Sequence, residues 1–249
     1  MSRRGSAAAA LLPAAVLLLA ARGAVAGPRA VRADVVVTYE RAGDGPAGGE
    51  RAAIEGYLVA ARPDRLRLST HFGFLKAFDL TAGQDSFWVA VPRYHAVLAG
   101  RKDQVRIVPL DPGRLSQALF LDPRGAGRPD SADTVADSLG ARVSGRDSLG
   151  DFQLALDREG EPLRLVRRRD DGTPFLDIEF ERYATVEGGR YPRRIRWRDL
   201  EGRQSLVMDF DNIVVDGEAP GTGFGAPADP DLKVVPWSSW EAVFTARSR

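Results

Sequence analysis

Three acidic side chains with alternating spacing are the first candidates for chemistry in this 249-residue chain. Asp177, Glu179 and Glu181 could supply the pair of carboxyl groups that glycoside hydrolysis uses. Their alternation with apolar residues, however, directs them to the solvent face of a β-strand, between two runs rich in arginine. Arginine neighbours keep carboxylates ionised, which is the opposite of what a general acid needs. We therefore interpret these residues as part of a solvated charge ladder.

The other motifs that could carry chemistry are weak. The two histidines, His71 and His95, do not have the spacing of a metal site. The glycine pattern at 221–226 lies between Pro220 and Pro227, and no predicted helix follows it to receive a pyrophosphate. The chain has no cysteine, which excludes disulfides, thiolate ligands and cysteine nucleophiles. We expect no enzymatic activity, no cofactor and no metal.

Charge and the first residues indicate where the protein works. A formal net charge of +1, with acidic rows beside each arginine cluster, argues against nucleic-acid binding. The N-terminus has the pattern of an export signal: Arg3 and Arg4, an apolar run at 7–21, and small residues up to Ala26. We expect cleavage after Ala26 and, because there is no cysteine, no lipid anchor on the mature chain. These features predict an exported, periplasmic protein.

Four runs between Phe152 and Phe210 alternate apolar and charged residues with a period of two, as half-buried strands do. The sign of the charged positions changes from run to run: Arg164 and Arg168, then Asp177, Glu179 and Glu181, then Arg194, Arg196 and Arg198, then Asp209 and Asp211. Opposite charges facing each other favour an antiparallel meander by roughly 0.2–1 kcal/mol per pair. The other face is expected to be apolar and to include Leu163 and Leu165.

The first half of the chain predicts further strands and one helix. The helix begins at Asp111 and Pro112, which have the capping and first-turn preferences, and continues to Leu121 with Leu115 and Leu119 one turn apart. A short polar helix is expected at 131–139. The predicted strands lie at 33–40, 54–61, 66–70, 76–80, 87–91, 96–99 and 104–108.

We therefore expect a single domain over 27–249 with a mainly β fold. About eleven antiparallel strands would form one strongly curved sheet, interrupted mid-chain by a helix. One or two helices are too few to cover the apolar face of such a sheet completely. The sheet therefore either closes on itself as a barrel or leaves a concave apolar pocket partly plugged by the helix, and both arrangements can bind apolar ligands.

Three segments resemble the LolA/LolB-like group of periplasmic lipoprotein carriers and receptors. They are the strand–Arg-Pro–strand hairpin at 56–68, the aromatic strand ending in proline at 85–92, and Gly223–Pro227 followed by 231–235. The resemblance implies an incomplete eleven-stranded barrel with a helical lid over a cavity for acyl chains. It also implies that Arg62 reaches inward to brace the lid, the alternative being an arginine in a solvent-exposed loop. Only 27–33 is available for the helix that usually precedes the first strand of this group, so the lid would rest mainly on the helix at 111–121.

The expected lipid cavity is defined by the inward-facing side chains of these elements. They are Leu58, Leu66, Leu68, Phe78, Leu80, Trp88, Leu115, Leu119, Leu154, Leu165, Ile178, Phe180, Trp197 and Met208. Phe74 and Leu75 lie on a loop between two strands, where they either contact a membrane or acyl chains or tuck under the sheet edge.

The leading hypothesis is a monomeric, non-enzymatic periplasmic carrier. Its ligands would be acyl chains of lipoproteins or other lipids, and its partners would be transport proteins of the inner or outer membrane. The alternative is an envelope sensory or structural module that uses the same half-barrel to bind a protein. A hydrolase that uses Asp177, Glu179 and Glu181 is the third and weakest reading.

Overall fold

The structure is a computed structural model. It describes residues 28–42, 49–63, 65–83, 85–102, 115, 118–120, 131–137, 140–147, 150–217, 223–227 and 229–239. The predicted export signal, the strand at 104–108 and the helix start at Asp111 and Pro112 lie outside these residues.

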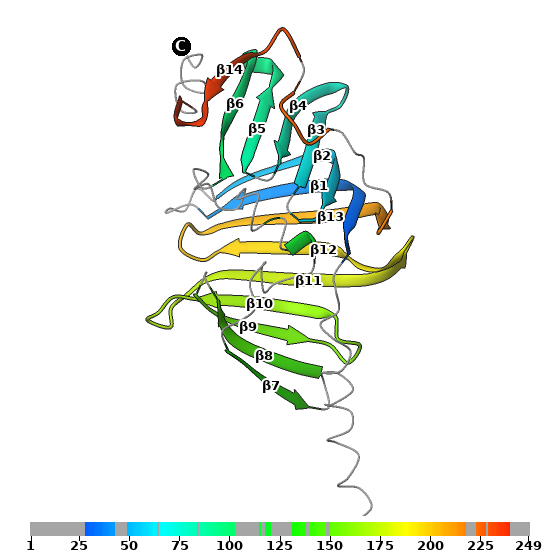
Figure 1. The fold of residues 1–249 in the computed structure, drawn as a ribbon, viewed down its shortest axis with the longest axis vertical. Coiled ribbons are helices and arrows are strands. Elements are labelled where there is room, and N and C mark those ends of the chain that lie inside the picture. Colours follow the sequence, from blue (N-terminus) through cyan, green and yellow to red (C-terminus); the bar gives the residue numbers. More distant parts are fainter. Residues whose placement is uncertain are drawn as a thin grey trace, which may run out of the picture.

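One large sheet forms the fold (Figure 1). Within the described residues its fourteen strands are β1 (Ala30–Arg41), β2 (Glu50–Ala61), β3 (Arg65–Phe72), β4 (Leu75–Ala82), β5 (Ser86–Val91), β6 (Ala96–Arg101), β7 (Ser131–Asp137), β8 (Gly140–Asp147), β9 (Gly150–Leu156), β10 (Pro162–Arg168), β11 (Pro174–Val186), β12 (Gly189–Asp199), β13 (Gln204–Val215) and β14 (Lys233–Pro236). Two short 3-10 turns, η1 (Pro92–Tyr94) and η3 (Trp237–Ser239), follow β5 and β14.

The strand order is β14-β6-β5-β4-β3-β2-β1-β13-β12-β11-β10-β9-β8-β7. Two meanders, β1–β6 and β7–β13, therefore meet where β1 pairs with β13. Neighbouring described strands pair antiparallel except β14, which runs parallel to β6. Figure 1 shows that β4–β6 run across the direction of β1 and β11–β13, so the sheet is strongly curved. Its ends, β14 and β7, do not pair, which confirms the prediction of an open, mainly antiparallel half-barrel.

The predicted polar helix at 131–139 is wrong. Its described part, 131–137, forms β7, and Val135 pairs with Arg142 on β8. β8 in turn pairs with β9, with Val143 opposite Leu154. The edge of β8, which is itself paired to β9, thus gives β7 a row of backbone partners, and this tertiary context overrides a weak local helical pattern. β7, β8 and β14 are the three strands by which the described sheet exceeds the predicted eleven.

A continuous apolar row crosses the inner face of the sheet. Tyr39 on β1 faces Leu206, Leu206 faces Trp197, Trp197 faces Ile178, and Ile178 faces Leu165 on β10. Side chains two residues apart share a face, so parallel rows repeat this arrangement along the strands. All of these residues belong to, or pack against, one hydrophobic cluster that forms the core. The apolar face predicted from the four alternating runs is therefore confirmed.

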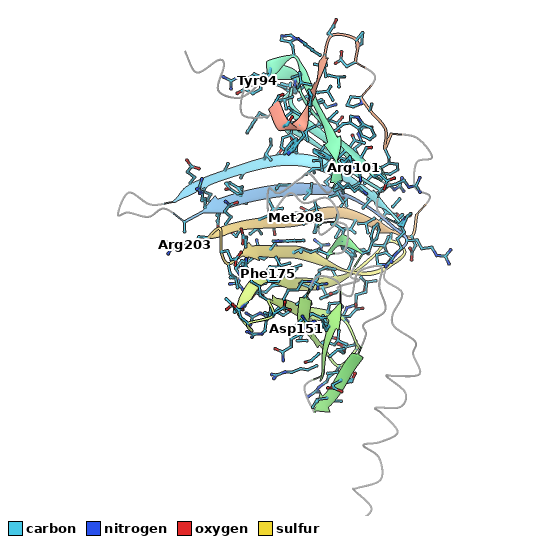
Figure 2. All side chains as sticks on the ribbon, turned by 60° about the vertical axis from the view of Figure 1, so that its left-hand side comes forward. Tyr94, Arg101, Asp151, Phe175, Arg203 and Met208 are labelled. Atoms are coloured by element: carbon cyan, nitrogen blue, oxygen red, sulfur yellow. The ribbon has the colours of Figure 1, made fainter. Side chains whose placement is uncertain are left out.

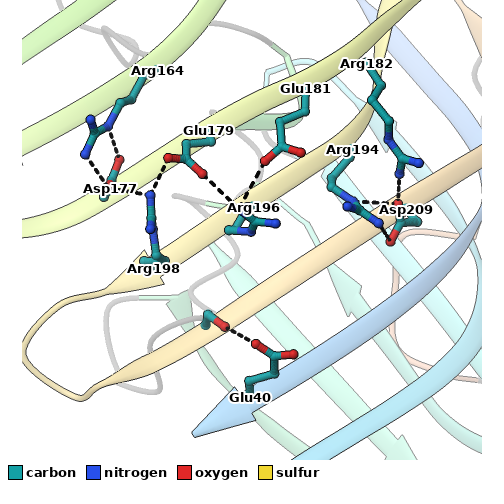
Figure 3. A network of polar contacts seen from close by, with 11 residues as sticks. Glu40, Arg164, Asp177, Glu179, Glu181, Arg182, Arg194, Arg196, Arg198 and Asp209 are labelled. Carbon is teal, nitrogen blue, oxygen red and sulfur yellow. Dashed lines mark hydrogen bonds and ion pairs between the residues drawn. The ribbon is translucent and has the colours of Figure 1, made fainter. Parts of the chain in front are cut away.

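The outer face of the same strands carries the predicted charge ladder (Figure 3). Arg164 donates two hydrogen bonds, of 2.9 and 2.8 Å, to the buried carboxylate of Asp177. Arg198 on β12 bridges Asp177, at 2.9 Å, and Glu179. Arg196 contacts the carboxylates of Glu179 and Glu181 at 3.2 Å each.

The ladder continues onto β13. Arg194 on β12 donates hydrogen bonds of 2.8 and 3.0 Å to Asp209, which Arg182 also contacts. The hydrogen bond with Asp209 raises the pKa of Arg194 above its ordinary value. Because the acidic row of β11 lies between the arginines of β10 and β12, the three carboxylates at 177, 179 and 181 act as ion-pair partners. This arrangement supports the structural interpretation of these groups over the catalytic one.

Two positions on β10 differ from the prediction. The pairing of β9 with β10 shifts between Pro162 and Arg164, so the residue between them, Leu163, lies at a bulge and is 41% exposed. A bulge adds one residue to one strand and changes the face of its side chain. The prediction that Leu163 joins the apolar face is wrong. Arg167 is instead buried on that face, with its guanidinium carbon 5.9 Å from the ring centre of Phe152.

Leu163 and Leu165 form a matched pair that tests this assignment, because they are two residues apart on one strand. Leu165 is 2% exposed, so Leu165→Ala should lower the free energy of unfolding by roughly 2–5 kcal/mol. Leu163→Ala should change it by less than about 0.5 kcal/mol. Denaturant unfolding of both variants measures the difference. Equal losses would contradict the bulge.

Candidate ligand-binding cavity

An apolar cavity of about 1080 Å³ lies on the inner face, where β1, β2 and β13 meet the crossing strands β3–β6. It is lined by Val37, Tyr39, Ala52, Ala53, Ile54, Phe72, Leu75, Lys76, Ala77, Phe78, Leu80, Phe87, Val89, Val91, Pro92, Arg93, Tyr94, Leu98, Leu206 and Trp237. Figure 2 shows Tyr94 near one end of the sheet, Met208 near its middle and Asp151 toward the opposite end. The cavity thus occupies one half of the inner face.

The sequence of β5 explains one wall of the cavity. Phe87, Val89 and Val91 are two residues apart, so all three side chains point to the cavity face. Val89 faces Leu80 on β4 and Leu98 on β6, which extends the apolar wall over three strands. The segment 233–237 borders this wall, because β14 pairs with β6 and Trp237 packs edge-on against Phe87 with ring centres 4.9 Å apart.

The structure divides the expected cavity residues into three groups. Phe78 and Leu80 line the cavity. Trp88 lies on the other face of β5, since its neighbours Phe87 and Val89 point inward. The remaining residues are buried in the packed core cluster and do not line the cavity: Leu58, Leu66, Leu68, Leu115, Leu119, Leu154, Leu165, Ile178, Phe180, Trp197 and Met208.

A helical segment packs into the core beside the cavity. Leu115, Ala118 and Leu119 are helical, and all three are buried with Phe120 in the same cluster as the inner face of the sheet. The hydroxyl of Tyr191 on β12 donates a buried hydrogen bond of 2.6 Å to the carbonyl oxygen of Leu119. Burial raises the pKa of Tyr191 far above its ordinary value, so the phenol stays protonated and able to donate. None of these helical residues is among the cavity lining.

Arg62 connects the β2–β3 turn to this segment. Its Nε donates a hydrogen bond of 3.1 Å to the carbonyl oxygen of Pro28, and one terminal nitrogen lies 3.4 Å from the carbonyl oxygen of Phe120. The guanidinium carbon also lies 5.1 Å from the centre of the Phe120 ring, within the range of a cation–π contact. The side chain is half-buried. Arg62 therefore links Pro28 and Phe120 to the same turn.

The turn between β3 and β4 projects an apolar tip from the cavity edge. Phe74 is 107% exposed, Leu75 is 77% exposed and Phe72 is 63% exposed. Gly73 adopts a positive φ of 58°, which glycine tolerates without strain and which permits this tight turn. Phe72 and Leu75 also line the cavity, so the exposed tip is continuous with its wall. The alternative in which Phe74 and Leu75 tuck under the sheet edge is wrong.

A buried carboxylate anchors the strand that follows the tip. Asp79 on β4 accepts hydrogen bonds from Lys76, at 2.6 Å, and from Arg67 on β3, at 3.1 and 2.8 Å. Burial by itself would raise the pKa of Asp79, but the bonds from Arg67 and Lys76 outweigh it and hold this pKa below its usual range. Asp79 is therefore ionised at neutral pH. It compensates the charge of Lys76, a residue of the cavity lining.

The described residues offer little for other kinds of chemistry. They contain no group of three or more histidine, aspartate or glutamate side chains positioned to hold a metal ion. Among the same residues, no helix has both the length and the apolar character needed to cross a lipid bilayer.

The open curved sheet, the helical segment on its inner face and the apolar cavity beside that segment define a half-barrel class of fold. A DUF1329 family protein from Desulfovibrio piger matches it with a TM-score of 0.55 and 12% identity, over 86% of this chain and 96% of that one. A LolA superfamily protein from Nitrosomonas europaea matches with a TM-score of 0.54 and 13% identity, over 80% and 92%. A putative outer membrane lipoprotein-sorting protein domain from Vibrio parahaemolyticus matches with a TM-score of 0.53 and 11% identity, over 84% and 93%.

The protein therefore has a LolA/LolB-like fold, as the three sequence segments predicted. No protein-family model matches the sequence, and no curated protein matches it either. At identities of 11–13% the structural likeness establishes the fold, and the function has to be argued from the cavity.

The hydrogen bond from Tyr191 to Leu119 makes the attachment of the helical segment testable. Tyr191→Phe should lower the free energy of unfolding by about 1 kcal/mol and raise hydrogen–deuterium exchange in the peptide that contains Leu115 and Leu119. Tyr183→Phe is the matched control, because Tyr183 donates a similar hydrogen bond of 2.8 Å to Pro162 on another part of the sheet. Equal exchange of this peptide in both variants would contradict the proposed attachment.

Proposed function

We propose that the protein is a non-enzymatic carrier that binds the acyl chains of lipoproteins or of other lipids in its inner cavity. The observation that carries this proposal is the cavity of about 1080 Å³ with an almost entirely apolar lining. Small-molecule sites typically have roughly 300–1000 Å³, and a site of this kind without charged pairs selects ligands by apolar area. The fold supports the proposal, since one similar structure is described as an outer membrane lipoprotein-sorting protein domain.

The energetics of binding favour lipids with more than one acyl chain. Each buried methylene contributes roughly 0.8 kcal/mol, so a chain of about a dozen carbons gains about 10 kcal/mol. Association and ordering cost about 4–15 kcal/mol, while a micromolar complex needs a net of about 8 kcal/mol. One chain alone therefore binds weakly. Diacyl and triacyl lipids would gain most from a cavity of this size.

In this proposal the protein works in the periplasm, after residues 1–26 have been removed as an export signal. Residues 27–249 form one domain. The carrier would work as a monomer that meets lipid-handling partners at the membranes on either side. Release of the ligand requires that a partner or a membrane compete for the same apolar surface. The exposed tip with Phe74 and Leu75, which borders the cavity, is the part of the molecule best placed for that contact.

Filling the cavity tests the proposal directly. Val89→Trp adds an indole to the cavity wall and removes the space of several methylenes, so the affinity for a fluorescent fatty acid should fall about tenfold or more. Val36→Trp is the matched control, because Val36 lies exposed on β1, outside this cavity. It should bind the probe as the wild type does.

Thermal unfolding of both tryptophan variants establishes that they are folded before the titrations are compared. Unchanged affinity in a folded Val89→Trp variant would show that the cavity is not the binding site.

Substitution of the apolar residues at the tip by charged ones tests whether the tip contacts membranes. The double substitution Phe74→Asp and Leu75→Asp should lower co-sedimentation with phospholipid vesicles about tenfold or more, because two apolar side chains could no longer enter the interface. Stability should not change, since both side chains are exposed. Val135→Asp removes an exposed apolar side chain from β7 at the other end of the sheet and serves as the control. Equal vesicle binding by the tip variant and the wild type would exclude this role.

A further inference from the structure

The charged side chains of the cavity lining are both basic. Among the described residues that form the wall, Lys76 and Arg93 carry charge, and no aspartate or glutamate is present. Arg93 lies in η1, the short turn after β5, and η1 packs against β4, on which Lys76 lies. The two cations therefore belong to neighbouring elements at one side of an otherwise apolar space.

The two cations differ in how far their charge is already compensated. The ammonium group of Lys76 is 2.6 Å from the buried, ionised carboxylate of Asp79. Arg93 is exposed, and no hydrogen bond or ion pair joins its side chain to another described residue. Asp79 also pairs with Arg67 and lies on the other face of β4 from the cavity residues Phe78 and Leu80, so no described carboxylate lines the cavity beside Arg93. The guanidinium of Arg93 is thus available to a ligand.

We infer that the cavity selects amphiphiles with an anionic head group, and that Arg93 binds this head group while the tail enters the apolar space. This inference rests on the proposed function and adds the class of ligand to it. A guanidinium is suited to carboxylate and phosphate oxygens, to which it donates paired hydrogen bonds. Its position beside an apolar wall lowers local screening and strengthens the contact compared with one in open water.

Three amphiphiles with one tail and different head groups test the inference. Dodecanoate and dodecyl phosphate are anionic, whereas 1-dodecanol is neutral, and calorimetric titration gives the affinity of each at low salt and at a pH where the acids are ionised. The wild type should bind both anions roughly threefold to tenfold more tightly than the alcohol, which is the contribution of one partly exposed charge pair. The preference should shrink as salt is added. The comparison of the two anions shows whether carboxylate or phosphate is preferred.

Substitution of Arg93 tests whether this side chain causes the preference for anionic over neutral amphiphiles. Arg93→Gln should bring both anions to the affinity of 1-dodecanol and leave the alcohol itself unaffected, and Arg93→Glu should reverse the order. Arg142→Gln is the matched control, because Arg142 is an exposed arginine on β8, far from the cavity along the sheet. It should keep the wild-type preference.

The outcomes separate this inference from the proposed function. Equal binding of anionic and neutral amphiphiles by the wild type, or a preference that survives in Arg93→Gln, overturns the role of Arg93 while the carrier function stands. Failure of all three single-tail amphiphiles to bind the wild type overturns the head-group selectivity, and failure of a diacyl phospholipid in the same titration overturns the carrier function as well.

Discussion

The apolar row that crosses the inner face of the sheet is the constraint on which the rest of the structure depends. Tyr39, Leu206, Trp197, Ile178 and Leu165 face one another on consecutive strands, and burial of such side chains is the main favourable term in folding. The charge ladder on the outer face fixes the same register from the other side, because the acidic row of β11 lies between the arginines of β10 and β12. One register therefore serves both faces.

The sheet is open, so other parts of the chain have to cover its inner face. Different segments cover the two halves of this face. Leu115, Ala118, Leu119 and Phe120 pack against the face as part of the core, held by Tyr191 and Arg62. The crossing strands β3–β6 and Trp237 surround the other half, which forms the cavity. The position of the helical segment thus decides which part of the apolar face is solid core and which part can accept a ligand.

The sequence predicts the class of fold and the charge ladder well because both follow from alternation within single strands. It does not predict the position of the cavity, because that depends on long-range pairing: Val89 faces Leu80 and Leu98, whereas the expected cavity residue Trp88 lies on the other face. The prediction for Leu163 fails because a bulge breaks the alternation that it assumes. The sequence does not predict the hairpin of β7 and β8, because its pairing with β9 outweighs a weak local preference.

The central claim is that the cavity on the inner face of the sheet binds lipid in the cell. Native mass spectrometry of the protein, released from its native envelope without detergent, tests this claim most directly. The account predicts a population with added mass that corresponds to acyl lipids and that is lost when the cavity is filled by a larger side chain. A spectrum with only the unliganded protein, with wild type and cavity-filled variant alike, would contradict it.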